Sequence, residues 1–365
     1  MLIVTAYRLR HDLSASIRSV ARLAGVSTAT VSRVMNGSAV VKARVRDTVL
    51  RAARELKYVP HAGARALATG RTNTVAVLLP EVHGAFFSEL IRELDQRAYT
   101  HGLRLLLGSL HGDMPEAERI LRLTHGQLDG VILMAPFLDV PQHLADVVAG
   151  IPMVLLNAPR SIPGCPVFAV DNASGAREVV RHFVALGYRD IAHIAGQPDN
   201  LDALERARGF REGLEEAGLP AGPDIPGDYS EHAGYEAGKR IAALARRPRA
   251  IFAANDNMAV GCLAALVEAG IRIPEEIAVA GFDDIPLARI TRPRLTTVRS
   301  PVAEQAARAF AWLLQAIERS PAETAQQDCG MTRLATTLVV RASSDPGASD
   351  RDDTSARDCT PCSSS

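Results

Sequence analysis

Residues 17–36 contain two short amphipathic segments that meet at a single glycine. The first segment repeats apolar residues at the spacing of one helix face, namely Ile17, Val20, Ala21 and Ala24. Gly25 suits a helix C-cap, because glycine adopts the left-handed backbone conformation at the least cost. Ser27 can then cap a second helix, whose inner face we expect to contain Val31, Val34 and Met35.

The outer face of the second segment carries small and hydrogen-bonding side chains: Thr28, Ala29, Thr30, Ser32 and Arg33. Such side chains suit a helix that lies in the DNA major groove, where base edges present donors and acceptors. Taken alone, the segment also fits an ordinary helical hairpin.

The charge distribution favours the nucleic-acid interpretation. Through Arg71 the chain has thirteen Lys or Arg and three Asp or Glu, whereas the whole chain has 41 of each. The remainder therefore carries 28 basic and 38 acidic residues, so a basic head precedes an acidic body. A basic head of this kind suits contacts with DNA phosphates. The alternative is a solvated basic face without a partner.

A length of 365 residues allows a head and a large or bilobed body. We expect no membrane span, because no run of about 18 uncharged apolar residues occurs. Residues 1–15 have too short an apolar stretch for a secretory signal, and we expect a flexible N-terminal extension.

The five cysteines are odd in number and scattered, which argues against a disulfide framework. Cys359 and Cys362 have Cys-x-x-Cys spacing but lie in a polar tail without a second ligand pair. We expect no metal site there, and we expect residues 344–365 to be a disordered tail.

The body alternates apolar runs with helical patterns, which is typical of parallel sheets covered on both faces. Eight such runs, among them 75–79, 103–107, 130–134 and 152–156, predict two α/β lobes. Ligands of such folds lie at the carboxyl ends of the strands. The polar or small residues that follow the runs are therefore binding candidates: Asp171, Asn172, Gly196, Asn255, Asp256, Asp283 and Asp284.

Enzyme signatures are missing from the sequence. It has no Gly-x-Gly-x-x-Gly turn after the first strand, no phosphate loop, no His-Glu-x-x-His and no Gly-x-Ser-x-Gly elbow. We therefore expect no enzyme, no catalytic residue, no cofactor and no metal ion.

An ordered set of motifs resembles the lactose repressor/galactose repressor family of transcription regulators. The set covers roughly residues 17–343 and comprises residues 19–37, 53–60, 65–72, 170–172, 206–210, 254–261, 281–284 and 295–298. The resemblance implies a helix-turn-helix head (residues 16–60), a hinge helix and linker (residues 61–71), and a two-lobed effector-binding and dimerisation domain (residues 72–343). The lobes would be doubly wound parallel sheets of the periplasmic-binding-protein type.

In the head, the resemblance implies a third helix near residues 43–57, although Lys42 stands where the family usually has a capping Ser or Thr. It also implies base contacts by Thr28, Ala29 and Arg33, and it makes Arg65 a phosphate contact and Leu67 a wedge in the minor groove. With these, the residues expected to bind DNA are Ser27, Thr28, Ala29, Thr30, Ser32, Arg33, Asn36, Arg65 and Leu67.

In the body, the resemblance makes Arg206 the arginine that clamps the effector. The other expected effector contacts are Phe86, Phe87, Asp171, Tyr229, Asn255 and Asp283. Two of these positions have a plain structural alternative, since Asp283 could cap a turn and Phe86 could belong to the core.

The sequence thus predicts a cytoplasmic homodimeric regulator, a repressor, that binds double-stranded operator DNA. A small molecule between the lobes, with sugars or sugar derivatives as the leading class, would control its affinity for DNA. The alternative is a periplasmic-type solute-binding protein without a regulatory role, which would carry a signal peptide in place of the basic head.

Overall fold

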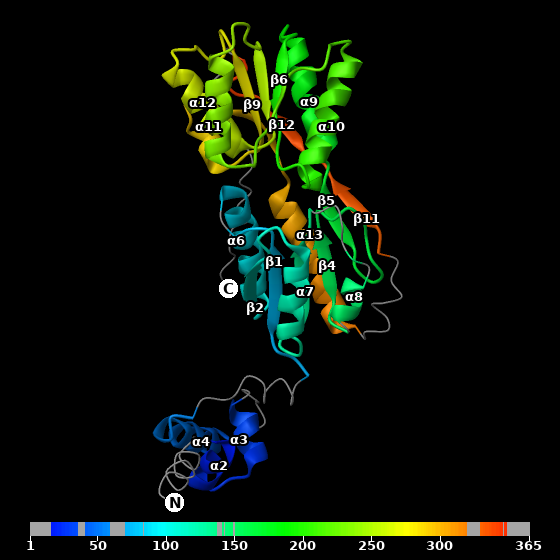
Figure 1. The fold of residues 1–365 in the computed structure, drawn as a ribbon. Coiled ribbons are helices and arrows are strands. Elements are labelled where there is room, and N and C mark those ends of the chain that lie inside the picture. The colour runs from blue at the N-terminus through cyan, green and yellow to red at the C-terminus, as the bar shows by residue number, and fades with distance from the viewer. Residues whose placement is uncertain are drawn as a thin grey trace, which may run out of the picture. The chain divides into compact units, whose positions relative to one another are not determined.

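The computed structural model describes residues 16–35, 41–58, 70–82, 84–136, 141, 143–148, 150–319, 329–345 and 347–348. The chain divides into two compact units, Met1–Thr72 and Asn73–Ser365. The first, which we call the head unit, contains α2 (Ile17–Ala24), α3 (Thr28–Met35) and α4 (Ala43–Glu55) (Figure 1).

The turn between α2 and α3 forms as its residues predict. Gly25 ends α2 in the left-handed conformation with φ 65°, and the Ser27 hydroxyl accepts a hydrogen bond from the Thr30 amide at 3.2 Å. As expected, α4 begins after Lys42 without a side-chain cap. One core holds the three helices together, and its buried residues are Val20, Ala21, Val31, Val34, Val49, Ala52 and Ala53.

Lobe 1 of the second unit is a six-stranded sheet of order β11-β5-β4-β3-β1-β2, in which every pairing is parallel. Its strands are β1 (Thr74–Leu79), β2 (Arg104–Ser109), β3 (Gly130–Met134), β4 (Met153–Leu156), β5 (Val167–Val170) and β11 (Met331–Leu334). One face packs on α6 (Ala85–Thr100) and α13 (Val302–Glu318), and the other on α7 (Met114–Leu123) and α8 (Leu144–Val147).

Lobe 2 has a second six-stranded sheet, of order β12-β10-β9-β8-β6-β7. Its strands are β6 (Ile191–Ile194), β7 (Asp224–Ile225), β8 (Ala250–Ala253), β9 (Ala278–Asp283), β10 (Thr296–Arg299) and β12 (Thr337–Val339). One face packs on α9 (Asn172–Ala185) and α10 (Leu201–Glu216), and the other on α11 (Glu231–Ala242) and α12 (Asp256–Glu268). A short 3-10 helix, η1 (Pro286–Arg289), follows β9.

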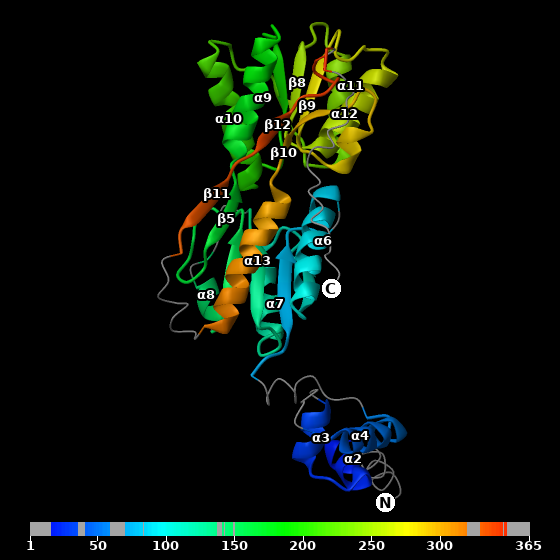
Figure 2. The same cartoon turned by 180° about the vertical axis from the view of Figure 1, so that it is seen from behind.

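The chain passes between the lobes three times, from β5 to α9, from β10 to α13 and from β11 to β12 (Figure 2). The predicted fold class, a helical head and two doubly wound α/β lobes, is confirmed. One strand departs from the parallel expectation: β12 pairs antiparallel with β10, because it enters lobe 2 from the opposite end of the sheet.

The run of residues 103–107 does form a strand, but it is not buried as a near-continuous apolar run predicts. Leu106 and Leu107 are 40% and 44% exposed. The physical reason is their position on β2, since β2 is an edge strand that pairs only with β1 among the described strands.

Glycines allow the helix pairs of lobe 2 to approach closely. A Cβ added at Gly209 of α10 would lie 2.0 Å from the carbonyl oxygen of Ala173 in α9. A Cβ at Gly261 of α12 would lie equally close, 2.0 Å, to the carbonyl oxygen of Glu231 in α11. Both glycines lie in sequence motifs that carried the family resemblance, and backbone contact explains why a side chain does not fit there.

The C-terminal boundary of the fold lies later than expected. Ser344, which we assigned to a disordered tail, is fully buried, and its hydroxyl lies 2.6 Å from the Thr296 hydroxyl. It is therefore part of lobe 2, whereas residues 349–365 lie outside the described residues. No helix in the described part of the chain is long and apolar enough to span a membrane.

Candidate functional site

A cavity of about 560 Å³ lies between the two lobes of the second unit. Lobe 1 contributes residues that follow β1, β2 and β3, and lobe 2 contributes residues that follow β6, β7, β8 and β9. The cavity is thus at the carboxyl ends of the strands in both sheets, where the sequence predicted a ligand crevice. Its volume is in the range usual for small-molecule sites.

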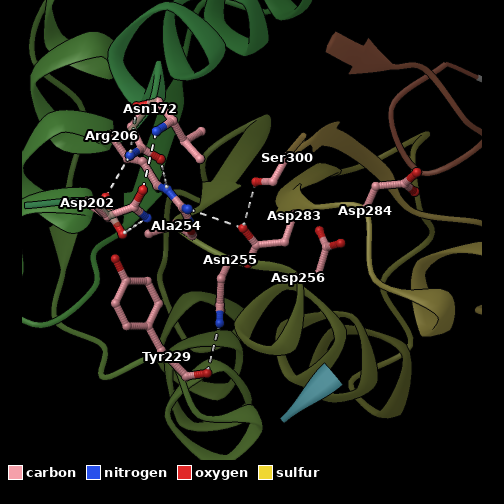
Figure 3. A network of polar contacts seen from close by, with 12 residues as sticks. Asn172, Asp202, Arg206, Tyr229, Ala254, Asn255, Asp256, Asp283, Asp284 and Ser300 are labelled. Carbon is pink, nitrogen blue, oxygen red and sulfur yellow. Dashed lines mark hydrogen bonds and ion pairs between the residues drawn. The ribbon is translucent and has the colours of Figure 1, made fainter. Parts of the chain in front are cut away.

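Arg206 lies at the centre of the polar contacts around this cavity (Figure 3). Its Nε donates to Asn172 Oδ1 at 2.8 Å, one Nη to the Ala254 carbonyl at 2.6 Å, and the other Nη to Asp283 Oδ1 at 3.1 Å. The guanidinium also stacks 3.8 Å from the centre of the Phe282 ring. With only 5% of Arg206 exposed, these contacts fix the side chain in one position.

Asp202 lines the cavity one helical turn before Arg206, although we did not expect it from the sequence. Its carboxylate accepts hydrogen bonds from the Asn157 and Asn172 amides at 2.9 and 2.8 Å. Burial raises the pKa of Asp202 to about 6, and the charge of Arg206 opposes that rise. The four-residue spacing to Arg206 on one helix was a signal that could have found it.

The first turns of α10 also join the two lobes. Leu201 donates its amide to the carbonyl of Pro136, after β3, at 2.7 Å. Glu205 accepts two hydrogen bonds, at 2.9 and 3.0 Å, from the guanidinium of Arg333 on β11. The helix that holds Arg206 therefore also contacts lobe 1.

Tyr229 has a strained backbone and a hydroxyl group without a partner. Its φ is 73°, and its carbonyl accepts a hydrogen bond from the Asn255 amide at 3.0 Å. The hydroxyl is buried without a hydrogen-bond partner in the described part of the chain, and burial raises its pKa. The ring packs against Gly196, where an added Cβ would lie 2.5 Å from it.

Two further expected contacts, Asn255 and Asp283, line the cavity at the ends of β8 and β9. Asn255 also caps α12 by accepting from the Met258 amide at 3.0 Å. Asp283 has φ 110° and accepts from the Ser300 hydroxyl at 3.2 Å. Burial raises the pKa of Asp283, and Arg206 opposes the rise.

Phe86 and Phe87, in the first turn of α6, both line the cavity. Their rings meet edge to face with centroids 5.4 Å apart. Both also pack against the core between the sheet and α13, so each residue belongs to the cavity wall and to the core.

Asp171 is the one expected effector contact that does not line the cavity. Its carboxylate accepts from the Ser174 amide at 3.2 Å and caps α9, so the structure gives it a helix-capping role.

Asp256 and Asp284 lie behind the cavity wall. Asp256 accepts from the Thr297 hydroxyl at 2.6 Å and from the Ile285 amide at 2.9 Å, which fixes the turn after β9. Asp284 accepts hydrogen bonds from three arginines, at 2.6 Å from Arg341, 2.8 Å from Arg299 and 3.1 Å from Arg289.

Several lining residues were not among the candidates named from the sequence. Five of them follow strands that the apolar runs predict, and three follow β7, which has two residues and therefore no apolar run. These residues are Glu81, His111, Gln197, Asn200, Asp228, Ser230, Glu231 and Asn257. Among the described residues, no group of three or more His, Cys, Asp or Glu is placed to hold a metal ion.

In the head unit, six of the residues expected to bind DNA lie in α3 or directly before it. Ser27, Thr28, Ala29 and Arg33 are exposed. Thr30 and Ser32 are half-buried, and the Thr30 hydroxyl lies 3.0 Å from that of Ser27. The remaining expected contacts, Asn36, Arg65 and Leu67, lie outside the described residues together with most of the hinge segment.

Comparison with known proteins matches both units. Residues 16–61 match the family of bacterial regulatory proteins called lacI, and residues 180–344 match a periplasmic binding protein-like domain. The regulator GalS of Salmonella typhimurium is 40% identical over 80% of this chain and 86% of its own. The regulator GalR of Escherichia coli is 35% identical over 84% of this chain and 90% of its own.

Solved structures agree. A complex of the transcriptional regulator CelR with cellobiose is 30% identical, has a TM-score of 0.66, and is matched over 90% of this chain and 99% of that one. The lac repressor dimer bound to operator and the anti-inducer ONPF is 25% identical, has a TM-score of 0.77, and is matched over the same shares, 90% and 99%. With this sequence similarity, the helix-turn-helix head and the two-lobed body with its cavity, the chain belongs to the lacI family of transcriptional regulators.

Proposed function

We propose that this regulator binds its operator as a homodimer and that a small molecule in the cavity between the lobes controls this binding. The observation that carries the proposal is the position of α10. This helix holds Arg206 and Asp202 in the cavity wall, and its first turns contact lobe 1 through Leu201 and Glu205. A ligand that changes the contacts of α10 therefore changes the relation between the lobes.

Base recognition is assigned to the exposed face of α3. Arg33 makes no hydrogen bond or ion pair with another described residue, so its guanidinium is available to guanine O6 and N7. Two copies of this helix in a dimer would read the two halves of a pseudo-palindromic operator. The solved lac repressor dimer bound to operator supports this arrangement. Its site of action would be the cytoplasm, where the operator is.

The experiment has two steps. Duplexes that bind the full-length protein are selected from a random library, and a thermal-shift screen of small molecules finds ligands of the cavity. Fluorescence anisotropy then measures operator affinity with and without each ligand. We expect a ligand to change operator affinity by about 5- to 150-fold, the usual size of allosteric coupling. Operator affinity that no cavity ligand changes would refute the proposal.

Arg206→Ala is the informative variant, with Arg211→Ala as its matched control on the same helix. Arg211 lies 3.9 Å from Asp224 on the surface of lobe 2, and its side chain is 62% exposed. We expect Arg206→Ala to keep operator binding and lose the ligand response, whereas Arg211→Ala should keep both.

A further inference from the structure

Carboxylates dominate the charge of the cavity. Among the described lining residues, five are acidic: Glu81, Asp202, Asp228, Glu231 and Asp283. The basic lining residues are Arg206 and one histidine, His111. A cleft lined mainly by one sign of charge repels ligands of that sign.

The charge of Arg206 is already compensated. Asp283 lies 3.1 Å from one of its Nη atoms, and the Arg206 and Asp283 side chains are only 6% and 9% exposed. A guanidinium has five N–H donors, and the protein uses three of them, one on each nitrogen. Arg206 can therefore give a ligand hydrogen bonds, but an anionic ligand would have to compete with Asp283 for its charge.

Tyr229 and Asp202 make complementary demands on a ligand. The Tyr229 hydroxyl points to the side where Asp202 lies (Figure 3), and it is buried without a partner in the described part of the chain. It therefore needs an acceptor, whereas an ionised Asp202 offers only acceptors. A hydroxyl group can accept from Tyr229 and donate to Asp202 at once. A phosphate or carboxylate oxygen can accept but has no proton to donate, and it is repelled by Asp202.

We infer that the cavity takes an uncharged, hydroxyl-rich ring and excludes its phosphorylated or carboxylated forms. The inference rests on the proposed function, since it names the class of effector. The Phe86 and Phe87 rings supply an apolar surface for the carbon face of such a ring. Asp283 is the residue that sets the selection, because it neutralises the one arginine in the described cavity wall.

The test uses matched pairs of probes with the full-length protein. Thermal shift and calorimetry are run at equal ionic strength with ribose and ribose 5-phosphate, glucose and glucose 6-phosphate, and galactose and galacturonate. The inference predicts that at least one neutral member binds and that its anionic partner binds at least about tenfold more weakly, a difference of about 1.4 kcal/mol. It is overturned if an anionic member binds as well as its neutral partner, or if no neutral member binds.

Variants then test the assigned cause. Asp283→Asn removes the carboxylate that pairs directly with Arg206, so we expect the neutral-to-anionic affinity ratio to fall at least about tenfold. Asp228→Asn changes an exposed lining residue and should lower the same affinity ratio by a smaller factor. This variant tests the charge argument if Asp283→Asn does not fold. Glu304→Gln on α13, whose side chain is 49% exposed and which does not line the cavity, is the matched control and should leave the ratio unchanged. If the neutral-to-anionic affinity ratio is unchanged in both Asp283→Asn and Asp228→Asn, the charge argument is refuted.

Anisotropy with operator DNA separates this inference from the proposed function. A neutral ligand that binds without changing operator affinity supports the inference and refutes the proposed control. An anionic ligand that binds and changes operator affinity overturns the inference and leaves the proposed control intact.

Discussion

Replacing Gly209 by alanine should destabilise the second unit and disturb the cavity wall. The new Cβ would lie 2.0 Å from the Ala173 carbonyl oxygen and 2.7 Å from two further backbone atoms of that residue. Carbon–oxygen contacts in proteins lie at about 3.3–3.6 Å, so α10 has to move away from α9. A clash with backbone cannot be relieved by a rotamer change, so we take the upper end of the usual overpacking cost, about 3 kcal/mol.

A second effect acts in the opposite direction. Alanine is favoured over glycine inside a helix by about 1 kcal/mol, which leaves a net loss of about 2 kcal/mol in the free energy of unfolding. For a domain of this size the melting temperature should fall by about 4–8 °C. The same displacement should lengthen the 2.8 Å bond from Arg206 Nε to Asn172, so the response to the effector should weaken as well.

Gly213→Ala is the matched control. It lies one turn later on α10 and gains the same helix propensity. Its Cβ would lie 2.8 Å from the Cβ of Val180, a smaller overlap than the 2.0 Å contact that Gly209→Ala makes with backbone, so we expect a smaller loss of stability. Urea and thermal denaturation of both variants measure the difference. If Gly209→Ala is as stable as Gly213→Ala, the backbone contact does not govern the packing of these helices, and the reasoning is refuted.

Three further predictions follow from other parts of the structure. Arg33→Ala should cost about 1–3 kcal/mol of operator affinity and relax preference at one base pair per half-site; a uniform loss on all sequences in a binding-site selection would show a phosphate contact instead. Asp284→Asn should lower the free energy of unfolding, measured in urea, by about 3–5 kcal/mol, because Arg341, with a side chain only 9% exposed, loses its anionic partner. The control is Glu304→Gln, which breaks an exposed ion pair and should cost less than about 1 kcal/mol. A loss for Asp284→Asn no larger than that of the control would contradict the prediction. Because the folded-state pKa of Asp202 is raised to about 6, its protonated form favours folding, and that contribution is lost as pH rises through 6. Relative to Asp202→Asn, the parent should therefore lose about 2 kcal/mol between about pH 4 and about pH 7. A difference that does not vary with pH would show an unshifted Asp202.

Local sequence signals predicted the head unit well because each acts over a few residues. Gly25 ends α2, Ser27 begins α3, and the spacing of Val31 and Val34 sets the buried face. None of these features depends on a distant part of the chain. The strands of both sheets could be predicted for a similar reason, because most of them are continuous apolar runs.

The cavity was harder to predict because its residues meet only after the lobes fold. Asp171 directly follows β5 and Asp283 is the last residue of β9, yet only Asp283 lines the cavity. The difference is in the backbone: φ of Asp283 is 110°, whereas Asp171 has φ −79° and caps the next helix. The spacing of Asp202 to Arg206 is a local signal, but the hydrogen bond that holds its carboxylate comes from Asn157, 45 positions earlier in the chain. Exposure of Leu106 and Leu107 depends in the same way on the strand order, which no single run encodes.

The contacts of α10 have a consequence for how mutations in this protein should be interpreted. Its first turn carries the Leu201 bond to Pro136, and Glu205 and Arg206 are adjacent in sequence but face Arg333 and the cavity, respectively. A helix is stiff over this length, so a displacement at either end of these contacts is transmitted as a rigid-body tilt. A substitution at Arg333, which does not line the cavity, can thus imitate a damaged binding pocket without touching it. A screen for variants whose operator binding no longer responds to the ligand should recover both cavity-wall variants and variants of this contact with lobe 1. Direct ligand titration will tell them apart, because only the cavity-wall variants lose ligand affinity.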